Sequence, residues 1–123
     1  MRDILVIGLG GFVGANARWL VYRTLGSTPT AFPWATVLVN VTGCFAAGLL
    51  MTMIAANAAP AWVRPLLVIG FLGAFTTFSA FGRETISLLQ HGRLGTATAY
   101  VVASLVVGLA ATAAGVVAGR ALA

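Results

Sequence analysis

Four apolar runs, each about as long as a helix that crosses a bilayer, fill this sequence and leave little polar sequence between them. The hydrocarbon core of a bilayer is about 30 Å thick, and a helix needs about 20 apolar residues to cross it. The runs cover residues 4–25, 34–56, 64–89 and 94–119, and short turns containing Gly, Pro or His separate them. The sequence therefore predicts an all-α membrane protein whose four transmembrane helices form one domain over residues 1–123.

The composition excludes several other classes of protein. Of the 123 residues, 60% are hydrophobic and only 7% are charged, whereas soluble domains average about 25% charged residues. The seven arginines stand singly among apolar runs and form no basic stripe, so no nucleic-acid partner is expected. No plausible nucleophile and base pair or metal-binding cluster stands out, so the chain is not expected to be an enzyme. The expected surroundings are a lipid bilayer.

The arginines at the ends of the runs give almost no orientation signal. With four spans, Arg2, Arg64 and Arg120 fall on one side of the membrane, and Arg23 and Arg93 fall on the other. Positive charge in short loops normally sets orientation, and three against two is a weak bias. The chain can therefore insert both ways, and two opposed copies can pair about an axis in the membrane plane. A parallel oligomer with one weakly set orientation is the alternative.

The third run is unusual between Gly70 and Phe81, where glycine and hydroxyl side chains replace the expected Leu and Val. Gly73 and the β-branched pair Thr76 and Thr77 weaken a helix. Backbone freed by a break at membrane depth is tolerated only where protein buries it or where it lines a site. The run therefore fits a broken helix with an ion site made by backbone, but the residues alone do not decide between this and an unbroken helix. A continuous helix whose hydroxyls bond preceding carbonyls is the alternative.

Other side chains in the runs suit an anion. Phe78 and Phe81 share a helical face, and the edges of aromatic rings carry partial positive charge, although such pairs are usually core packing. Asn40 offers two donors and one acceptor, either to join helices or to meet an anion. Tyr100 and Ser104, four residues apart, present two hydroxyls on one face.

Arg18 stands at membrane depth after a long uncharged run. A charge inside a bilayer usually faces a cavity or a partner, because its burial in lipid is costly. A long side chain can instead extend to the headgroups and leave only its stem in lipid. Both interpretations of Arg18 follow from the sequence.

Three motifs together resemble the Fluc/CrcB family of fluoride channels, and the resemblance covers essentially the whole chain. The first is the glycine-rich stretch Gly10–Trp19, which ends near an arginine. The second is the asparagine motif in Thr36–Phe45. The third and most specific is Gly70–Glu84, which contains Thr-Thr-Phe-Ser-x-Phe followed by an acid.

The resemblance implies a fluoride-selective passive channel that exports fluoride across the bacterial plasma (inner) membrane. It implies a dual-topology antiparallel homodimer with two pores. Phe78 and Phe81 would form an aromatic box whose ring edges face fluoride, Asn40 would donate a hydrogen bond nearby, and Arg18 would lie near an aqueous vestibule. A polar track would follow the third and fourth helices at Ser79, Tyr100 and Ser104.

The resemblance also implies a structural Na⁺ at the dimer interface, held by the backbone carbonyls of Gly73 and Thr76 from both chains. The sequence departs from the family pattern at two positions. Ala74 stands where the family usually has a second glycine, and Ala80 stands where it usually has threonine. We expect the cation site to survive the first change, and the second to remove one pore hydroxyl.

Two other functions compete with the channel. A small dual-topology multidrug or cation exporter needs a carboxylate inside the membrane, yet the first run carries Arg18, and Glu84 lies near a helix end. A non-conducting membrane assembly subunit would explain the many small residues. It would not explain the polar and aromatic run from Thr76 to Phe81.

Overall fold

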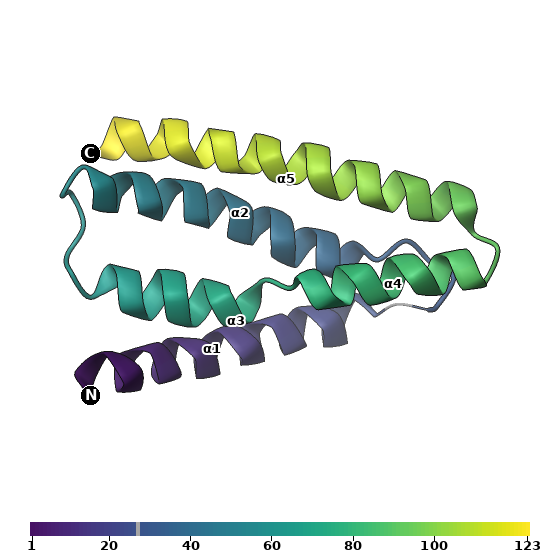
Figure 1. The fold of residues 1–123 in the computed structure, drawn as a ribbon, viewed down its shortest axis with the longest axis horizontal. Coiled ribbons are helices and arrows are strands. Elements are labelled where there is room, and N and C mark those ends of the chain that lie inside the picture. The colour runs from purple at the N-terminus through teal and green to yellow at the C-terminus, as the bar shows by residue number, and fades with distance from the viewer. Residues whose placement is uncertain (27) are drawn as a thin grey trace.

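The computed structural model describes residues 1–26 and 28–123, and the chain forms a bundle of four long helical spans (Figure 1). Ser27, in the first predicted turn, lies outside the described residues. The third span consists of three consecutive helical segments, and no strand occurs among the described residues. The helices are α1 (Arg2–Leu25), α2 (Trp34–Ala55), η1 (Arg64–Leu72), α3 (Gly73–Phe75), α4 (Phe78–Gln90) and α5 (Leu94–Leu122).

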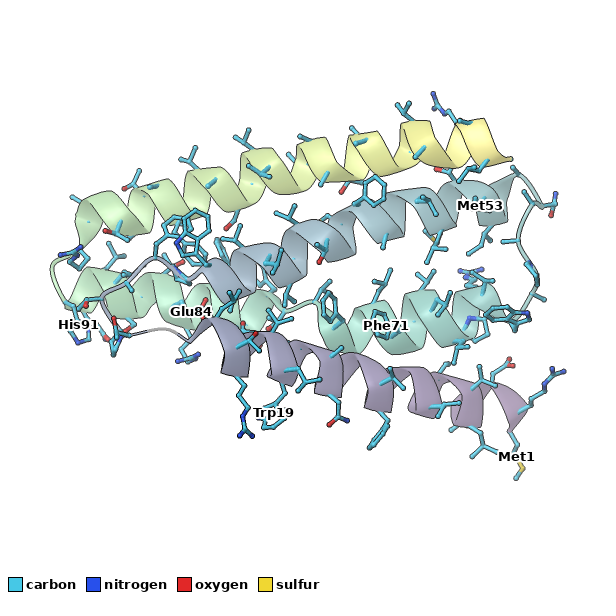
Figure 2. The ribbon with its side chains drawn as sticks, turned by 180° about the vertical axis from the view of Figure 1, so that it is seen from behind. Met1, Trp19, Met53, Phe71, Glu84 and His91 are labelled. Carbon is cyan, nitrogen blue, oxygen red and sulfur yellow. The ribbon has the colours of Figure 1, made fainter. Side chains whose placement is uncertain are left out.

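Each span is long and apolar enough to cross a bilayer, with lengths of 24, 22, 27 and 29 residues. Large apolar side chains cover the outside of the bundle, and Trp19 of α1 points away from the other helices (Figure 2). Soluble proteins rarely expose apolar surface of this extent. The chain is therefore a multi-pass membrane protein with four spans, as the sequence predicted.

The spans pack mainly as two pairs, and the third span changes partner along its length (Figure 1). α2 packs along α5, and α1 packs along η1 and α3. Beyond the break, α4 packs against α5 instead. The break therefore lies where the third span passes from one pair to the other.

Glycines allow the closest approaches between helices. A Cβ on Gly48 of α2 would collide with the carbonyl of Thr112, and one on Gly115 of α5 would collide with the carbonyl of Phe45. Small residues bring helix backbones together in lipid, where packing replaces the hydrophobic driving force. α2 and α5 therefore meet backbone to backbone.

Close packing at glycines also joins α1 to the third span. A Cβ on Gly10 would collide with the carbonyl of Leu66, and one on Gly14 would collide with the carbonyl of Phe71. The segment η1 that α1 meets is a π-helix over nine residues, a conformation that the sequence did not predict. π-helical turns are rare and often lie next to functional sites.

A small core lies at the end of the bundle where α4 is joined to α5, between these two helices and the beginning of α2. Leu88, Ala97 and Tyr100 are almost fully buried there. Three partly buried side chains pack against them, namely Phe32, Val37 and Phe81. This core fixes α4 against α5 and so positions the residues that follow the break.

Candidate functional site

The third span is interrupted at Thr76 and Thr77, which is the first of the two alternatives that the residues left open. Both residues have extended backbone, with φ −76° and ψ 159° at Thr76 and φ −154° and ψ 120° at Thr77. The hydroxyl of Thr77 then accepts a hydrogen bond from the N–H of Ala80 at 3.1 Å. Threonine suits extended backbone and also serves as an N-cap, so this pair ends one helix and begins the next.

The side chain of Asn40 holds the backbone of the break. Its Nδ2 donates to the carbonyl of Thr77 at 2.9 Å, and its Oδ1 accepts from the N–H of Thr77 at 2.8 Å. A paired β-strand would supply the same two bonds, but here one amide side chain of α2 supplies both. The amide keeps a second N–H for the interaction with an anion that the sequence suggested.

The carbonyls of the last turn before the break lose their helical partners, and those of Gly73 and Thr76 are two of them. In a continuous helix, the N–H of Thr77 would bond to the carbonyl of Gly73, and that of Ala80 would bond to the carbonyl of Thr76. Those two N–H groups instead bond to the side chains of Asn40 and Thr77. The carbonyls of Gly73 and Thr76 are thereby released from the helix, and these are the two residues that the resemblance assigned to a cation.

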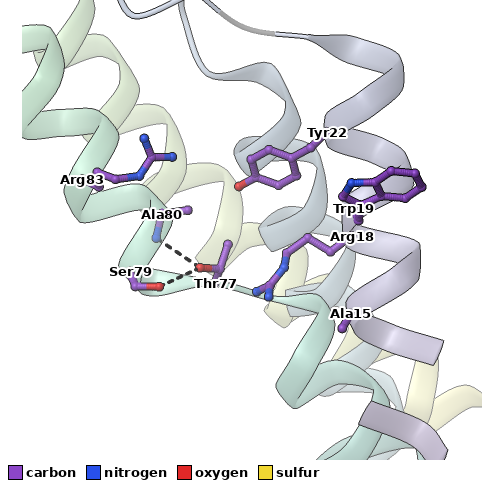
Figure 3. A pocket seen from close by; sticks show the side chains of 8 residues that line it. All are labelled: Ala15, Arg18, Trp19, Tyr22, Thr77, Ser79, Ala80 and Arg83. Atoms are coloured by element: carbon purple, nitrogen blue, oxygen red, sulfur yellow. Dashed lines mark hydrogen bonds between the residues drawn. The ribbon is translucent and has the colours of Figure 1, made fainter. Parts of the chain in front are cut away.

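Arg18 reaches the break from α1. Its Nη1 donates to the carbonyl of Thr76 at 3.1 Å, and the residue is partly buried. Of the two interpretations that the sequence allowed, the structure has the guanidinium directed inward and not toward the headgroups (Figure 3). The positive charge therefore lies beside the released carbonyl.

A groove of about 470 Å³ opens on one side of the break, and we refer to it as the groove. The ring of Phe78 is 83% exposed, and its centroid lies 5.6 Å from that of Phe81. Cys44 and Leu105 form part of the apolar wall. Six of the sequence-predicted site residues line it: Asn40, Gly73, Thr76, Phe78, Phe81 and Ser104.

A second hollow of about 500 Å³ lies between α1 and the start of α4, and we refer to it as the vestibule cavity (Figure 3). Two predicted residues, Arg18 and Ser79, line it, and the hydroxyl of Ser79 lies 3.2 Å from that of Thr77. Among the described residues, those lining it are Ala15, Arg18, Trp19, Tyr22, Thr77, Ser79, Ala80 and Arg83, and none is acidic. Because Ala80 lines this cavity, its missing hydroxyl is a change to the vestibule cavity.

The break separates the two hollows, and Thr77 lines both of them. Phe78 lies on the groove side and Ser79 on the vestibule side. The structure thus divides the predicted site residues into two groups that share the backbone of the break.

Tyr100 lies in neither hollow. It is fully buried, its hydroxyl donates to Oε2 of Glu84 at 2.7 Å, and its ring centroid lies 5.2 Å from that of Phe81. Its hydroxyl is therefore committed to a carboxylate, and its ring supports the aromatic pair. The structure gives Tyr100 a supporting place behind the groove.

Three polar residues near the break were missing from the predicted site. Thr77 lines both hollows, Glu84 holds Tyr100, and the hydroxyl of Tyr22 bonds to that of Thr36. Glu84 carried a detectable signal, because it is the only acidic residue inside a predicted span. The contact of Tyr22 with Thr36 had none, because it depends on how α1 meets α2.

Together, the fold and the site define a small polytopic membrane protein whose third helix is broken inside the bilayer and lined by polar groups. The sequence matches the family described as CrcB-like protein, Camphor Resistance (CrcB), over residues 5–116, and the chain belongs to this family.

Full-length relatives agree with this assignment. The protein of Acidobacterium capsulatum is 45% identical over 122 residues, which cover 94% of each chain. That of Prosthecochloris aestuarii is 45% identical over 107 residues, 86% of this chain and 84% of the relative. That of Rhizobium leguminosarum bv. trifolii is 43% identical over all of both chains. Each carries the name Fluoride-specific ion channel FluC.

Proposed function

We propose that this chain is a fluoride-selective channel that carries fluoride passively across the membrane as an antiparallel homodimer. The observation that carries the proposal is the exposed Phe78 ring beside the broken third span, in a groove that one protomer leaves open. The relatives named as fluoride-specific ion channels support the choice of ion.

The groove has the chemistry that an anion needs when it loses water. The hydroxyl of Ser104 and the second N–H of Asn40 are donors, and the edges of the Phe78 and Phe81 rings are partly positive. Among the described residues that line the groove, none is acidic. An anion therefore meets donors and ring edges there, without a like charge to repel it.

The same chemistry favours fluoride over chloride. Fluoride is small and strongly hydrated, so a pore must replace its water with several donors at close range. Selectivity by close fit and donor number is a general property of ion channels. Fluoride enters cells as neutral HF and ionises inside, so a passive channel is sufficient to export it.

A second copy of the chain is the partner that best completes the groove. Phe78 is 83% exposed, and Gly73 is exposed with only the carbonyl of Val68, at 4.0 Å, near the position of a Cβ. Among the residues that the structure describes, no tight contact requires glycine at position 73, whereas a close approach by another chain would. The balanced arginines of the loops are compatible with two opposed copies.

The released carbonyls of Gly73 and Thr76 suit a hard cation such as Na⁺, which prefers oxygen ligands. Two carbonyls from each chain would give four oxygens at a dimer interface. Na⁺ bound there would supply a fixed positive charge beside the anion pathway. Arg18 holds the Thr76 carbonyl in place and adds a second positive charge close to it.

Efflux from liposomes tests the proposed function. We expect purified protein to release trapped fluoride rapidly and to leave trapped chloride inside, as read by ion-selective electrodes. Protein-free liposomes and a Phe78→Ile variant are the controls. Well-folded protein that releases no fluoride, or that releases both halides equally, would overturn the proposal.

The dimer and the cation need separate measurements. Light scattering in detergent should give a protein mass twice the 12.6 kDa of the chain. Thermal unfolding in Na⁺ should occur at a higher temperature than in N-methylglucamine at equal ionic strength, because a ligand that binds only the folded state stabilises it. A monomeric mass would contradict the proposal that two protomers share the groove. Equal unfolding temperatures in the two salts would contradict the proposed Na⁺ site.

A further inference from the structure

The vestibule cavity contains a second guanidinium to which neither the sequence motifs nor the proposed pore assigns a role. Arg83 lines it from α4 and Arg18 lines it from α1, so two cations face one hollow from different helices (Figure 3). Thr77 lies between them in the same view. Since none of the described lining residues is acidic, the cavity has a single sign of charge.

The neighbouring carboxylate of Glu84 does not cancel the charge of Arg83. Its Oε1 lies 3.8 Å from Nη2 of Arg83, while its Oε2 accepts the 2.7 Å hydrogen bond of Tyr100. Glu84 is only 11% exposed and does not line the vestibule cavity; it lines a neighbouring recess, which Arg83 also borders. An ion pair this long, with the Arg83 side chain 74% exposed, is weak, so the field of Arg83 persists in the cavity.

The two arginines differ in what holds them. Arg18 is partly buried and donates to the carbonyl of Thr76, so it belongs to the structure of the break. Arg83 makes no side-chain hydrogen bond among the described residues, and its exposed side chain lines the cavity. Arg83 therefore acts through the electrostatic field that its positive charge exerts on ions in the vestibule cavity.

We infer that Arg83 is an electrostatic guide that concentrates fluoride in the vestibule cavity and so sets the rate of entry into the pore. This inference rests on the proposed function. A cleft lined by one sign of charge focuses the field and raises the local concentration of the opposite ion. One exposed unit charge near the ion path changes that concentration about two- to fourfold at low ionic strength.

The guide acts on rate and not on selectivity, because a field attracts every small anion alike. The close-range donors that distinguish fluoride lie beyond it, at the break and in the groove. Removing the charge of Arg83 should therefore slow fluoride without admitting chloride.

The test measures initial fluoride efflux from proteoliposomes at about 20 mM and about 300 mM of an impermeant salt, where the Debye length falls from roughly 20 Å to roughly 6 Å. The variants are Arg83→Gln, Arg83→Glu and Arg83→Lys. The matched control is Arg93→Gln, an exposed arginine in the turn after α4 that lines neither the groove nor the vestibule cavity. Thermal unfolding of each variant verifies that it is folded.

At low salt, Arg83→Gln should reduce the rate about two- to fourfold and Arg83→Glu more, while Arg83→Lys and the control should match the parent. At high salt the differences should largely disappear, and chloride should stay excluded throughout. Three outcomes would overturn the inference while leaving the channel intact. They are an unchanged efflux rate in Arg83→Gln at low salt, a reduction of the rate that is equally large at high salt, and a reduced rate in Arg83→Lys. Absence of fluoride efflux in the parent would instead overturn the proposed function.

Discussion

The two ends of α2 are held by opposite means. Toward its C-terminus, Gly48 meets the backbone of α5 directly, and the polar groups nearby are satisfied within their own helices. Thr52 bonds to the carbonyl of Gly48, and Thr112 bonds to that of Gly108. Toward its N-terminus, α2 extends the amide of Asn40 to a broken helix. We refer to these regions as the packed end and the polar end.

The long-range side-chain hydrogen bonds among the described residues all lie at the polar end. They join Arg18 to Thr76, Tyr22 to Thr36, Asn40 to Thr77 in both directions, and Tyr100 to Glu84. Lipid offers no hydrogen-bond partner, so a broken helix there needs side chains to replace the lost backbone bonds. Close packing therefore sets the shape of the bundle at one end, and polar side chains that replace lost backbone bonds set its chemistry at the other.

The largest effect is expected from filling a glycine at the packed end. Gly115→Ala places a methyl group against the carbonyl of Phe45, and overpacking of this kind destabilises by about 1–3 kcal/mol or more. The folded yield and the unfolding temperature in detergent should fall sharply. Gly95→Ala is the matched control, because nothing lies within 4 Å of its Cβ position. Equal stability of the two variants would show that the packed end is looser than described.

Asn40 gives an effect of the same order, and two substitutions separate its roles. Asn40→Leu leaves both the N–H and the carbonyl of Thr77 without partners, at a cost of about 1–3 kcal/mol for each group. Asn40→Asp retains the acceptor but sets a carboxylate against the Thr77 carbonyl and beside the anion path, so it should block fluoride passage. Thermal unfolding and fluoride efflux measure the two quantities. Normal fluoride efflux in Asn40→Asp would contradict the assignment of Asn40 to the fluoride pathway.

The aromatic pair should show a separation between stability and flux. Phe78→Ile should impair fluoride efflux with little change in protomer stability, because its ring is 83% exposed. Phe81→Ile should impair efflux and also lower stability, since its ring packs on Tyr100. Efflux and unfolding temperature of both variants provide the test. Unchanged flux in both would contradict the aromatic-box assignment.

The smallest effect is expected from a hydroxyl at the packed end. Thr112→Val keeps the shape of the side chain and removes only a bond to the carbonyl of Gly108 in its own helix. Stability should change by less than about 1 kcal/mol, and fluoride efflux should match the parent. A clear loss of flux would mean that the packed end contributes to the ion pathway.

The sequence was sufficient for the four spans, which follow from local features, whereas the residues alone left the break undecided and the resemblance to the family favoured it. Apolar runs of bilayer length define spans, and Gly73 with the Thr76 and Thr77 pair weakens a helix wherever it stands. The partners of the polar groups were not predictable. Asn40 can bond to any neighbouring helix, and its choice of Thr77, 37 residues away, depends on how the helices pack.

The division of the site also lay beyond the sequence. Phe78 and Ser79 are adjacent in the chain, yet they line different hollows, because the extended backbone at Thr77 sets the direction in which α4 begins. The bond between the Tyr100 hydroxyl and Glu84 was likewise not predictable from the sequence. Both features depend on contacts between helices that periodicity does not specify.

The clamp between Asn40 and Thr77 also has a consequence for biogenesis. A third span that enters the bilayer alone has nothing to satisfy the amide and carbonyl of Thr77 except its own helix. We therefore expect the nascent segment to insert as an unbroken helix and to open only when α2 docks beside it. A half-assembled chain would then contain no released carbonyls, and the polar site would form only when α2 and the third span come together.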